Sequence, residues 1–421
     1  MITIESSLAQ DNVPVASENV ANYMLVKLFP TAGEGTSSLP LNLSVVIDNS
    51  GSMYGTDQRI THAVEAACHV VDMLGPQDVI SVVAFHDHAR ILHSSISAEN
   101  KEVIREAVRS VTGWESGGTR MATGMVKACE EVARNLSSDR VNRVMLLTDG
   151  NTEAESECQR VAEEETRRGI VFSTFGVGDD YNERLLVKIA ELGRGRPYYV
   201  DTPAAIPGIF ERELAGLQKT LVTNVVLTTV LKQGVTVKKA RLVEPEIADV
   251  VTEEVREREL LVKLGSMQKD EPVYLLFQLS LGPRQPGQYN ISDLFAMFDA
   301  PGEPDQRART DPVSVLVTYT TDPSQLWQNG DVLRYVDMEH VDTMVKRGTI
   351  LAEQGQKDKA TKLLSAAAQV SQRTGDKVKT KLIEDALGEL GTAGRIDRKT
   401  QLAMTYRARE TKVGPEEEVE D

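Results

Sequence analysis

The sequence predicts an α/β protein in which a doubly wound, mostly parallel sheet is inserted in a β-sandwich and followed by a C-terminal helical region. Three observations support this fold class. Strand and helix patterns alternate through residues 36–220, as in doubly wound sheets. β-Branched runs without helices between them fill residues 221–321, as in antiparallel sandwiches. A helical period returns over residues 322–410, with turn signals at Gly355 and Gly375.

The two ends of the chain complete this division into domains. Residues 1–35 hold one clear strand pattern, at 23–29, followed by a Gly/Ser-rich connection. This strand has no partner of its own, so we expect it to join the sandwich. Residues 36–220 then form a domain inserted between two pieces of one β-domain. Residues 411–421 are predicted to be an acidic, disordered tail.

Within the inserted domain, the apolar periods define each element in order. The order of these elements predicts a sheet with strand order 3-2-1-4-5-6, because right-handed crossovers go first one way and then the other. The first and fourth strands are then neighbours, and their carboxyl ends lie at the same edge of the sheet. The expected strands are residues 43–47, 79–85, 89–93, 141–148, 170–177 and 198–200, and the expected helices are 59–74, 101–111, 121–136, 155–168, 183–192 and 204–219.

Polar residues follow the first of these strands directly. Asp48, Ser50 and Ser52 alternate along the chain, and Gly51 lets the backbone bend between them. An open loop can therefore turn one carboxylate and two hydroxyls towards a single point. Converging hard oxygen donors suit a small hard cation, Mg²⁺ above all.

This D-x-S-x-S spacing at a strand end resembles the metal-ion-dependent adhesion site (MIDAS) of von Willebrand factor type A (VWA) domains. That family pattern adds a threonine after a glycine pair and an aspartate that closes a later buried strand. Thr119 follows Gly117 and Gly118, and Asp149 follows the strand pattern at 141–148. The resemblance implies a bacterial-type VWA protein with an intact MIDAS that binds Mg²⁺, with Mn²⁺ or Ca²⁺ as substitutes, through Asp48, Ser50, Ser52, Thr119 and Asp149.

The resemblance also implies how such a site works. In the family the serines and the threonine touch the metal, the aspartates act largely through water, and an open position receives a partner's carboxylate. We therefore expect a protein–protein interaction module or adaptor in bacterial signalling, stress response or complex assembly. The expected partner presents an Asp or Glu, and kinases, phosphatases and AAA+ ATPases are the expected classes. In the alternative, Ser50, Ser52 and Thr119 only cap loops and helices. Asp48 and Asp149 would then face each other as like charges without a cation.

A Mg²⁺-dependent phosphohydrolase is the alternative from another functional class. Asp48 and Asp149 with Mg²⁺ at the ends of parallel strands would suit phosphoryl transfer. Phosphatases of the haloacid-dehalogenase type, however, place a second carboxylate two residues after the nucleophilic aspartate, where this chain has Ser50. The sequence contains no G-x-x-x-x-G-K-[ST] loop. We therefore predict that the protein is not an enzyme.

Other polar and aromatic residues admit two interpretations each. His86-Asp87-His88 is either a second metal or partner contact or a solvent-facing turn, and we favour the turn. Trp114 is either an exposed anchor for a partner or packed under its loop, and the sequence favours neither. Basic residues recur along the last helix. They either bind nucleic acid or form a solvated face paired with the acidic tail, and we favour the solvated face. These residues are Arg395, Arg398, Lys399, Arg407 and Arg409.

Composition excludes several functional classes. The net charge of −16 argues against nucleic-acid binding, because phosphates would be repelled. No stretch is long and apolar enough to cross a membrane, and the N-terminus lacks the basic and apolar regions of a secretory signal. Cys68, Cys129 and Cys158 fall in helical patterns and are odd in number, which indicates a reduced, cytoplasmic protein. Nothing in the sequence specifies the oligomeric state.

Overall fold

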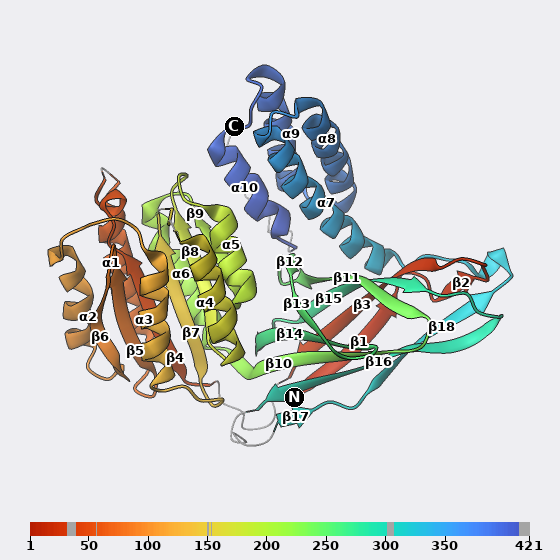
Figure 1. The fold of residues 1–421 in the computed structure, drawn as a ribbon, viewed down its shortest axis with the longest axis horizontal. Helices are drawn as coiled ribbons and strands as arrows, with labels where there is room; N and C mark the ends of the chain where they lie inside the picture. The colour runs from red at the N-terminus through yellow and green to blue at the C-terminus, as the bar shows by residue number, and fades with distance from the viewer. Residues whose placement is uncertain (32–38, 56, 150, 153, 301–306, 412–421) are drawn as a thin grey trace.

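The computed structural model describes residues 1–31, 39–55, 57–149, 151–152, 154–300 and 307–411. Figure 1 shows an α/β domain on the left, a β-sandwich at the lower right and a helical bundle above them. The predicted fold class is therefore confirmed. The Gly/Ser-rich connection at 32–38 and the acidic tail at 412–421 lie outside the described residues. No helix among the described residues is long and apolar enough to span a membrane.

The α/β domain is built on a six-stranded sheet whose order, β6-β5-β4-β7-β8-β9, is the predicted 3-2-1-4-5-6. β4 pairs in parallel with both β5 and β7, and only β6 is antiparallel. The central strands are buried along their whole length, which explains their unbroken apolar sequence. The strands are β4 (Leu41–Asp48), β5 (Val79–Phe85), β6 (Ala89–Ser97), β7 (Val141–Thr148), β8 (Val171–Val177) and β9 (Arg194–Val200).

Helices cover both faces of this sheet. Successive residues of β4 alternate between the two faces, so Val45 packs with α1 and α6 while Val46 packs with α3 and α4. One face carries α1 (Arg59–Met73), α2 (Lys101–Arg109) and α6 (Ile206–Leu217), and the other carries α3 (Met121–Ala133), α4 (Glu155–Arg167) and α5 (Glu183–Leu192). Short 3₁₀ turns are η1 (Gly51–Tyr54), η2 (Ser110–Gly113) and η3 (Pro203–Ala205).

The sandwich has one sheet ordered β1-β3-β15-β11-β12 and another ordered β13-β14-β10-β16-β18-β2, with β17 beside β16. β3 pairs with β15 from Val20↔Leu281 to Leu28↔Val273, so the N-terminal segment joins the sandwich and the α/β domain is an insertion. The strands are β1 (Ile2–Leu8), β2 (Asn12–Pro14), β3 (Val20–Pro30), β10 (Thr220–Leu231), β11 (Val235–Glu244), β12 (Ala248–Asp249), β13 (Val251–Arg256), β14 (Glu259–Gln268), β15 (Val273–Leu281), β16 (Gly287–Asp299), β17 (Arg307–Arg309) and β18 (Val313–Thr320).

Sequence reasoning missed several of these strands. The N-terminal segment contributes β1 and β2 as well as the expected strand, and β16 was not predicted. β1 alternates buried isoleucines with exposed hydroxyl and acidic residues. The first half of β16 reads GQYNISD, which lacks a β-branched run. Polar residues interrupt the apolar residues of β1 and of the first half of β16, so neither segment contains the continuous apolar run by which the other strands were recognised.

The helical bundle consists of α7 (Gly330–Glu353), α8 (Lys357–Thr374), α9 (Lys377–Thr392) and α10 (Arg398–Arg409). The turns fall where predicted: Gly355 and Gly375 have φ of 72° and 80°, values that favour glycine. α10 lies between the bundle and the α/β domain (Figure 1), and its Leu402 packs with α4 and α5.

The prediction of a solvated basic face is correct for Arg395 and Lys399, which are exposed, and wrong for Arg398 and Arg409. Arg398 pairs with Glu183 at the start of α5. Arg409 is only 1% exposed, and its guanidinium lies 3.0 Å from Glu191 and 3.5 Å from Glu246. Because these acids belong to the α/β domain and the sandwich, α10 joins the three parts of the molecule. Pairing across domains leaves no local sequence pattern.

Candidate functional site

The site predicted from the sequence lies at the carboxyl edge of the central sheet. Asp48 ends β4, and Asp149 comes immediately after β7. These strands are parallel neighbours, with Ile47 opposite Leu147. Their ends therefore bring Asp48 and Asp149 to one place, as the predicted strand order requires.

Asp48 is completely buried behind the loop that follows it. Its Oδ1 accepts a hydrogen bond from the Ser50 backbone N–H at 2.8 Å, and its Oδ2 accepts one from the Thr148 hydroxyl at 2.5 Å. Burial raises the pKa of Asp48 to about 6, and the nearby charge of Asp149 adds to the rise, while the hydrogen bonds oppose it. Asp48 thus holds the loop in shape and adds negative potential beneath it.

The two serine hydroxyls and Asp149 form a continuous chain at the surface of the loop. The Oγ atoms of Ser50 and Ser52 are 3.1 Å apart, and the Ser52 hydroxyl donates to Asp149 Oδ1 at 2.6 Å. Ser52 is exposed, whereas Ser50 and Asp149 are buried. The hydroxyls of Ser50 and Ser52 therefore lie together beside Asp149, and the hydroxyl of Ser52 is open to solvent.

Backbone contacts bring the loop that carries Thr119 to the same edge. Gly51 N–H donates to the Gly117 carbonyl at 3.0 Å. A Cβ on Gly117 would lie 2.4 Å from Asp87 Oδ2, and one on Gly118 would lie 2.6 Å from Asp87 Oδ1. A side chain at either position would therefore displace the Asp87 carboxylate, and one at position 117 would also meet the His86 ring, 2.7 Å from its Nδ1. Thr119 is partly buried, and its hydroxyl makes no hydrogen bond to the other predicted ligands in the part of the chain that the structure describes.

The turn after β5 supports this loop, which corrects the prediction that the turn only faces solvent. The exposed Asp87 accepts the Gly118 N–H at 3.1 Å, which lowers the pKa of Asp87. The His86 side chain is only 12% exposed and lies against Trp114, with ring centroids 4.0 Å apart. Trp114 also packs against the core, so of its two interpretations the packed one is correct.

Arg59 is the residue that sequence reasoning missed. Its Nη1 donates to Asp149 Oδ2 at 2.8 Å, and its Nη2 lies 3.1 Å from Asp57. Asp149 therefore has a positive partner within the chain, contrary to the expectation that only a bound cation could neutralise it. A signal was present in the sequence: Arg59 is the first residue of α1, whose first turn has no acid. A cation at a helix N-terminus interacts unfavourably with the helix dipole. An arginine at that position therefore indicates that a carboxylate lies nearby to compensate.

The chemistry of these side chains fits a divalent cation. The described residues contain no group of three or more His, Cys, Asp or Glu side chains able to hold a metal, so a cation here would depend on hydroxyl ligands. Ser50 and Ser52 supply two at short separation, beside Asp149. Such oxygen donors suit Mg²⁺, Mn²⁺ or Ca²⁺. Arg59 competes for Asp149, so its ion pair opposes the binding of a second positive charge.

Comparison with known proteins identifies the domain that carries this site. Residues 42–212 match the family model of the von Willebrand factor type A domain. This part of the chain is therefore a VWA domain, a protein-interaction module. A solved von Willebrand factor type A structure from Catenulispora acidiphila shares the fold with a TM-score of 0.84 at 20% identity. That likeness covers 97% of this chain and 96% of the other, so the shared fold includes the sandwich and the bundle.

Two bacterial relatives show how far the sequence similarity extends. The uncharacterized protein sll0103 of Synechocystis sp. is 27% identical over 325 residues, which are 76% of this chain and 76% of that protein. The uncharacterized protein YfbK of Escherichia coli is 30% identical over 189 residues. That alignment covers 44% of this chain but only 32% of YfbK. Bacterial homologues therefore exist, and the similarity to YfbK covers less than half of this chain.

Proposed function

We propose that this protein is a cytoplasmic bacterial adaptor that binds an acidic residue of a partner protein through a divalent cation. Ser50, Ser52 and Thr119 would hold the cation directly, and Asp48 and Asp149 would balance its charge. The observation that supports this most is the chain of contacts from Ser50 through Ser52 to Asp149. The cation is Mg²⁺, with Mn²⁺ or Ca²⁺ as substitutes.

The geometry also favours an acidic protein partner. Ser52 and the backbone at Gly118 are exposed at the rim of the site, so a side chain from another protein can approach without a conformational change. A bound cation and Arg59 both place positive charge at that rim, which attracts a carboxylate. Kinases, phosphatases and AAA+ ATPases are the partner classes included in the proposal.

The phosphohydrolase alternative has less support. A nucleophilic Asp48 would need an open path to phosphorus, yet this side chain is completely buried. Both of its oxygens accept hydrogen bonds from within the domain, from Ser50 and Thr148. Asp48 is therefore positioned to support the loop and is poorly placed for in-line attack.

Calorimetric titration of the EDTA-treated protein with Mg²⁺ and Mn²⁺ tests the cation site. We expect one-site binding for the wild type and loss of binding in Ser50→Ala and Thr119→Ala. Ser116→Ala is the matched control, because Ser116 is an exposed serine of the same loop, and it should bind like the wild type. Equal binding by all four proteins would place the cation elsewhere.

Affinity capture of partners from a native lysate tests the second half of the proposal. Capture should require Mg²⁺, be lost in EDTA and be lost in Ser50→Ala, while Ser116→Ala retains it. Capture that survives EDTA but disappears in Arg59→Met would overturn the cation-bridged mechanism. The guanidinium would then receive the partner's carboxylate directly.

A further inference from the structure

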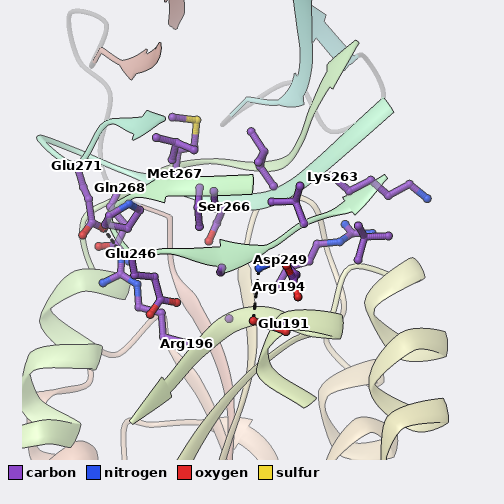
Figure 2. A pocket seen from close by; sticks show the side chains of 18 of the residues that line it. Glu191, Arg194, Arg196, Glu246, Asp249, Lys263, Ser266, Met267, Gln268 and Glu271 are labelled. Atoms are coloured by element: carbon purple, nitrogen blue, oxygen red, sulfur yellow. Dashed lines mark hydrogen bonds and ion pairs between the residues drawn. The ribbon is translucent and has the colours of Figure 1, made fainter. Parts of the chain in front are cut away.

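A groove between the VWA domain and the sandwich contains an arginine that has no partner among the described residues. β9 and β14 lie side by side there, and Figure 2 shows Arg194 and Arg196 on the VWA side facing Lys263 and Ser266 on the sandwich side. Arg194 lines a cavity of about 100 Å³ and also lines a larger one of about 310 Å³. The smaller cavity is also lined by acids, which are Glu191, Glu213, Glu246, Asp249 and Glu271. We therefore call only the larger cavity the Arg194 groove.

The Arg194 guanidinium makes no hydrogen bond or ion pair with the described residues. Its Nε is buried and has no acceptor, and burial lowers the pKa of Arg194 to about 10. Two residues further along β9, Arg196 pairs with Glu271 at 2.7 Å. Because Arg194 as a whole is only partly buried, its unpaired guanidinium is accessible to a ligand. Of these two arginines of β9, Arg194 is therefore the one whose N–H donors are available to a ligand.

A second arginine, beside the groove, is also incompletely satisfied. Arg143 is 5% exposed and lines the smaller cavity, and its Nε has no acceptor among the described residues. A Cβ on Gly195 would lie 2.9 Å from Arg143 Nη1 and 2.0 Å from the Phe172 carbonyl. Glycine at position 195 thus lets the backbone beside Arg194 pass close to Arg143, whose Nη1 donates to Ser173 and lies 3.9 Å from Glu213.

The larger cavity has a strongly positive lining in a chain whose net charge is −16. Arg168 pairs with Glu165 at 2.8 Å, and Lys263 pairs with Glu253 at 2.7 Å. Arg167 pairs with Glu163 at 2.6 Å, and Arg307 lies 3.3 Å from Asp299. Each of these four pairs has at least one partly or fully exposed partner, and such pairs are weak enough for the cation to turn to a ligand. The charged residues of the lining are Arg167, Arg168, Arg194, Lys263, Arg307 and a single acid, Asp299.

We propose that the Arg194 groove binds the phosphate group of a small molecule. A guanidinium matches the oxygens of phosphate with paired N–H donors, and surrounding cations suit a dianion better than a single carboxylate. The volume of about 310 Å³ lies at the lower end of the roughly 300–1,000 Å³ range of small-molecule sites. The junction of two domains is also a common place for such sites. This site is separate from the proposed cation site, because β9 begins at Arg194 and its parallel neighbours run from this end towards Asp149.

Calorimetric titration in EDTA, with inorganic phosphate and separately with glycerol phosphate, tests this proposal. Sodium acetate and sodium sulfate at matched ionic strength control for general anion effects. Arg194→Gly is the informative variant, because Arg194 has φ of 55° and glycine adopts that conformation without strain. We expect phosphate affinity to fall by roughly ten- to a hundredfold in this variant. Arg109→Ala, which removes a 56% exposed arginine of α2, should bind like the wild type.

The outcomes separate the possible ligands and the possible failures. Binding of glycerol phosphate that is tighter than binding of phosphate assigns the groove to a phosphate ester, and the reverse assigns it to free phosphate. Ser50→Ala should leave phosphate binding unchanged, so failure of the cation proposal does not affect this one. The proposal would be overturned by no phosphate binding by the wild type, or by phosphate binding to Arg194→Gly as tight as to the wild type. Binding of acetate to the wild type as tight as binding of phosphate would also overturn it.

Discussion

The two ends of β7 carry charged residues in different surroundings. At its carboxyl end, Asp149 lies among hydroxyls at an open rim and is paired with Arg59. Near its other end, Arg143 is buried beside Glu213, at 3.9 Å, and donates to the Ser173 hydroxyl at 3.2 Å. The exposed hydroxyl beside Asp149 leaves a place for a ligand. The buried pair of Arg143 and Glu213 instead stabilises the packing of the strand. At the second end only the Nε of Arg143 has no acceptor among the described residues, so this cluster is held mainly by contacts within the protein.

Loss of the enclosed acid should have the largest effect on stability. Glu213→Ala would leave Arg143 buried without a counter-charge and would remove hydrogen bonds to Ser173 and Tyr198. We expect a loss of about 3–5 kcal/mol in the free energy of unfolding, measured by chemical denaturation. Glu211→Ala is the control on the same helix, because Glu211 is 57% exposed. A loss below 1 kcal/mol would mean that the enclosed network is not stabilising.

The raised pKa of Asp48 predicts how the free energy of unfolding of the protein depends on pH. Between the ordinary pKa of 3.8 and the folded value of about 6, the native state holds a proton that the unfolded chain has released. Stability of the metal-free protein should therefore fall as pH rises through 6, by about 1–3 kcal/mol. Denaturation at pH 5, 6 and 7 in EDTA should show this slope in the wild type and not in Asp48→Asn. Identical slopes would exclude Asp48 as its source.

Arg59 provides a test of charge competition at the open rim. Arg59→Met removes the guanidinium that pairs with Asp149, so a divalent cation should bind about tenfold more tightly. Arg59→Lys keeps the positive charge and should remain near the wild type. Calorimetry with Mn²⁺ measures both variants. Weaker binding in Arg59→Met would mean that Arg59 organises the site and does not compete with the cation.

The smallest expected effect concerns the support of the Thr119 loop. Asp87→Ala removes the acceptor of the Gly118 N–H, which is an exposed contact. We expect cation affinity to fall about twofold to fivefold, as for loss of a single exposed hydrogen bond. Global stability should stay within about 0.5 kcal/mol. An unchanged affinity would show that the glycine backbone alone positions Thr119.

Sequence reasoning succeeded where a signal is local and failed where it is not. The alternation of Asp48, Ser50 and Ser52 after an apolar run was enough to place them at one edge, and element order placed Asp149 beside them. The pairing of Arg59 with Asp149 joins residues 90 positions apart. The position of Arg59 at a helix N-terminus indicated that an acid lies nearby, but no periodicity identified Asp149 as that acid. The same reason hides Arg409, which meets acids of two other domains.

Crystals of the protein soaked in Mn²⁺ give the most direct test of the central claim. An anomalous difference map identifies manganese independently of any assumed ligand set. We predict one strong peak in contact with the hydroxyls of Ser50, Ser52 and Thr119, with the Arg59–Asp149 ion pair opened. A map without a peak at the carboxyl edge of β4 and β7, or with Arg59 still paired to Asp149 and manganese bound elsewhere, would contradict the proposed cation site.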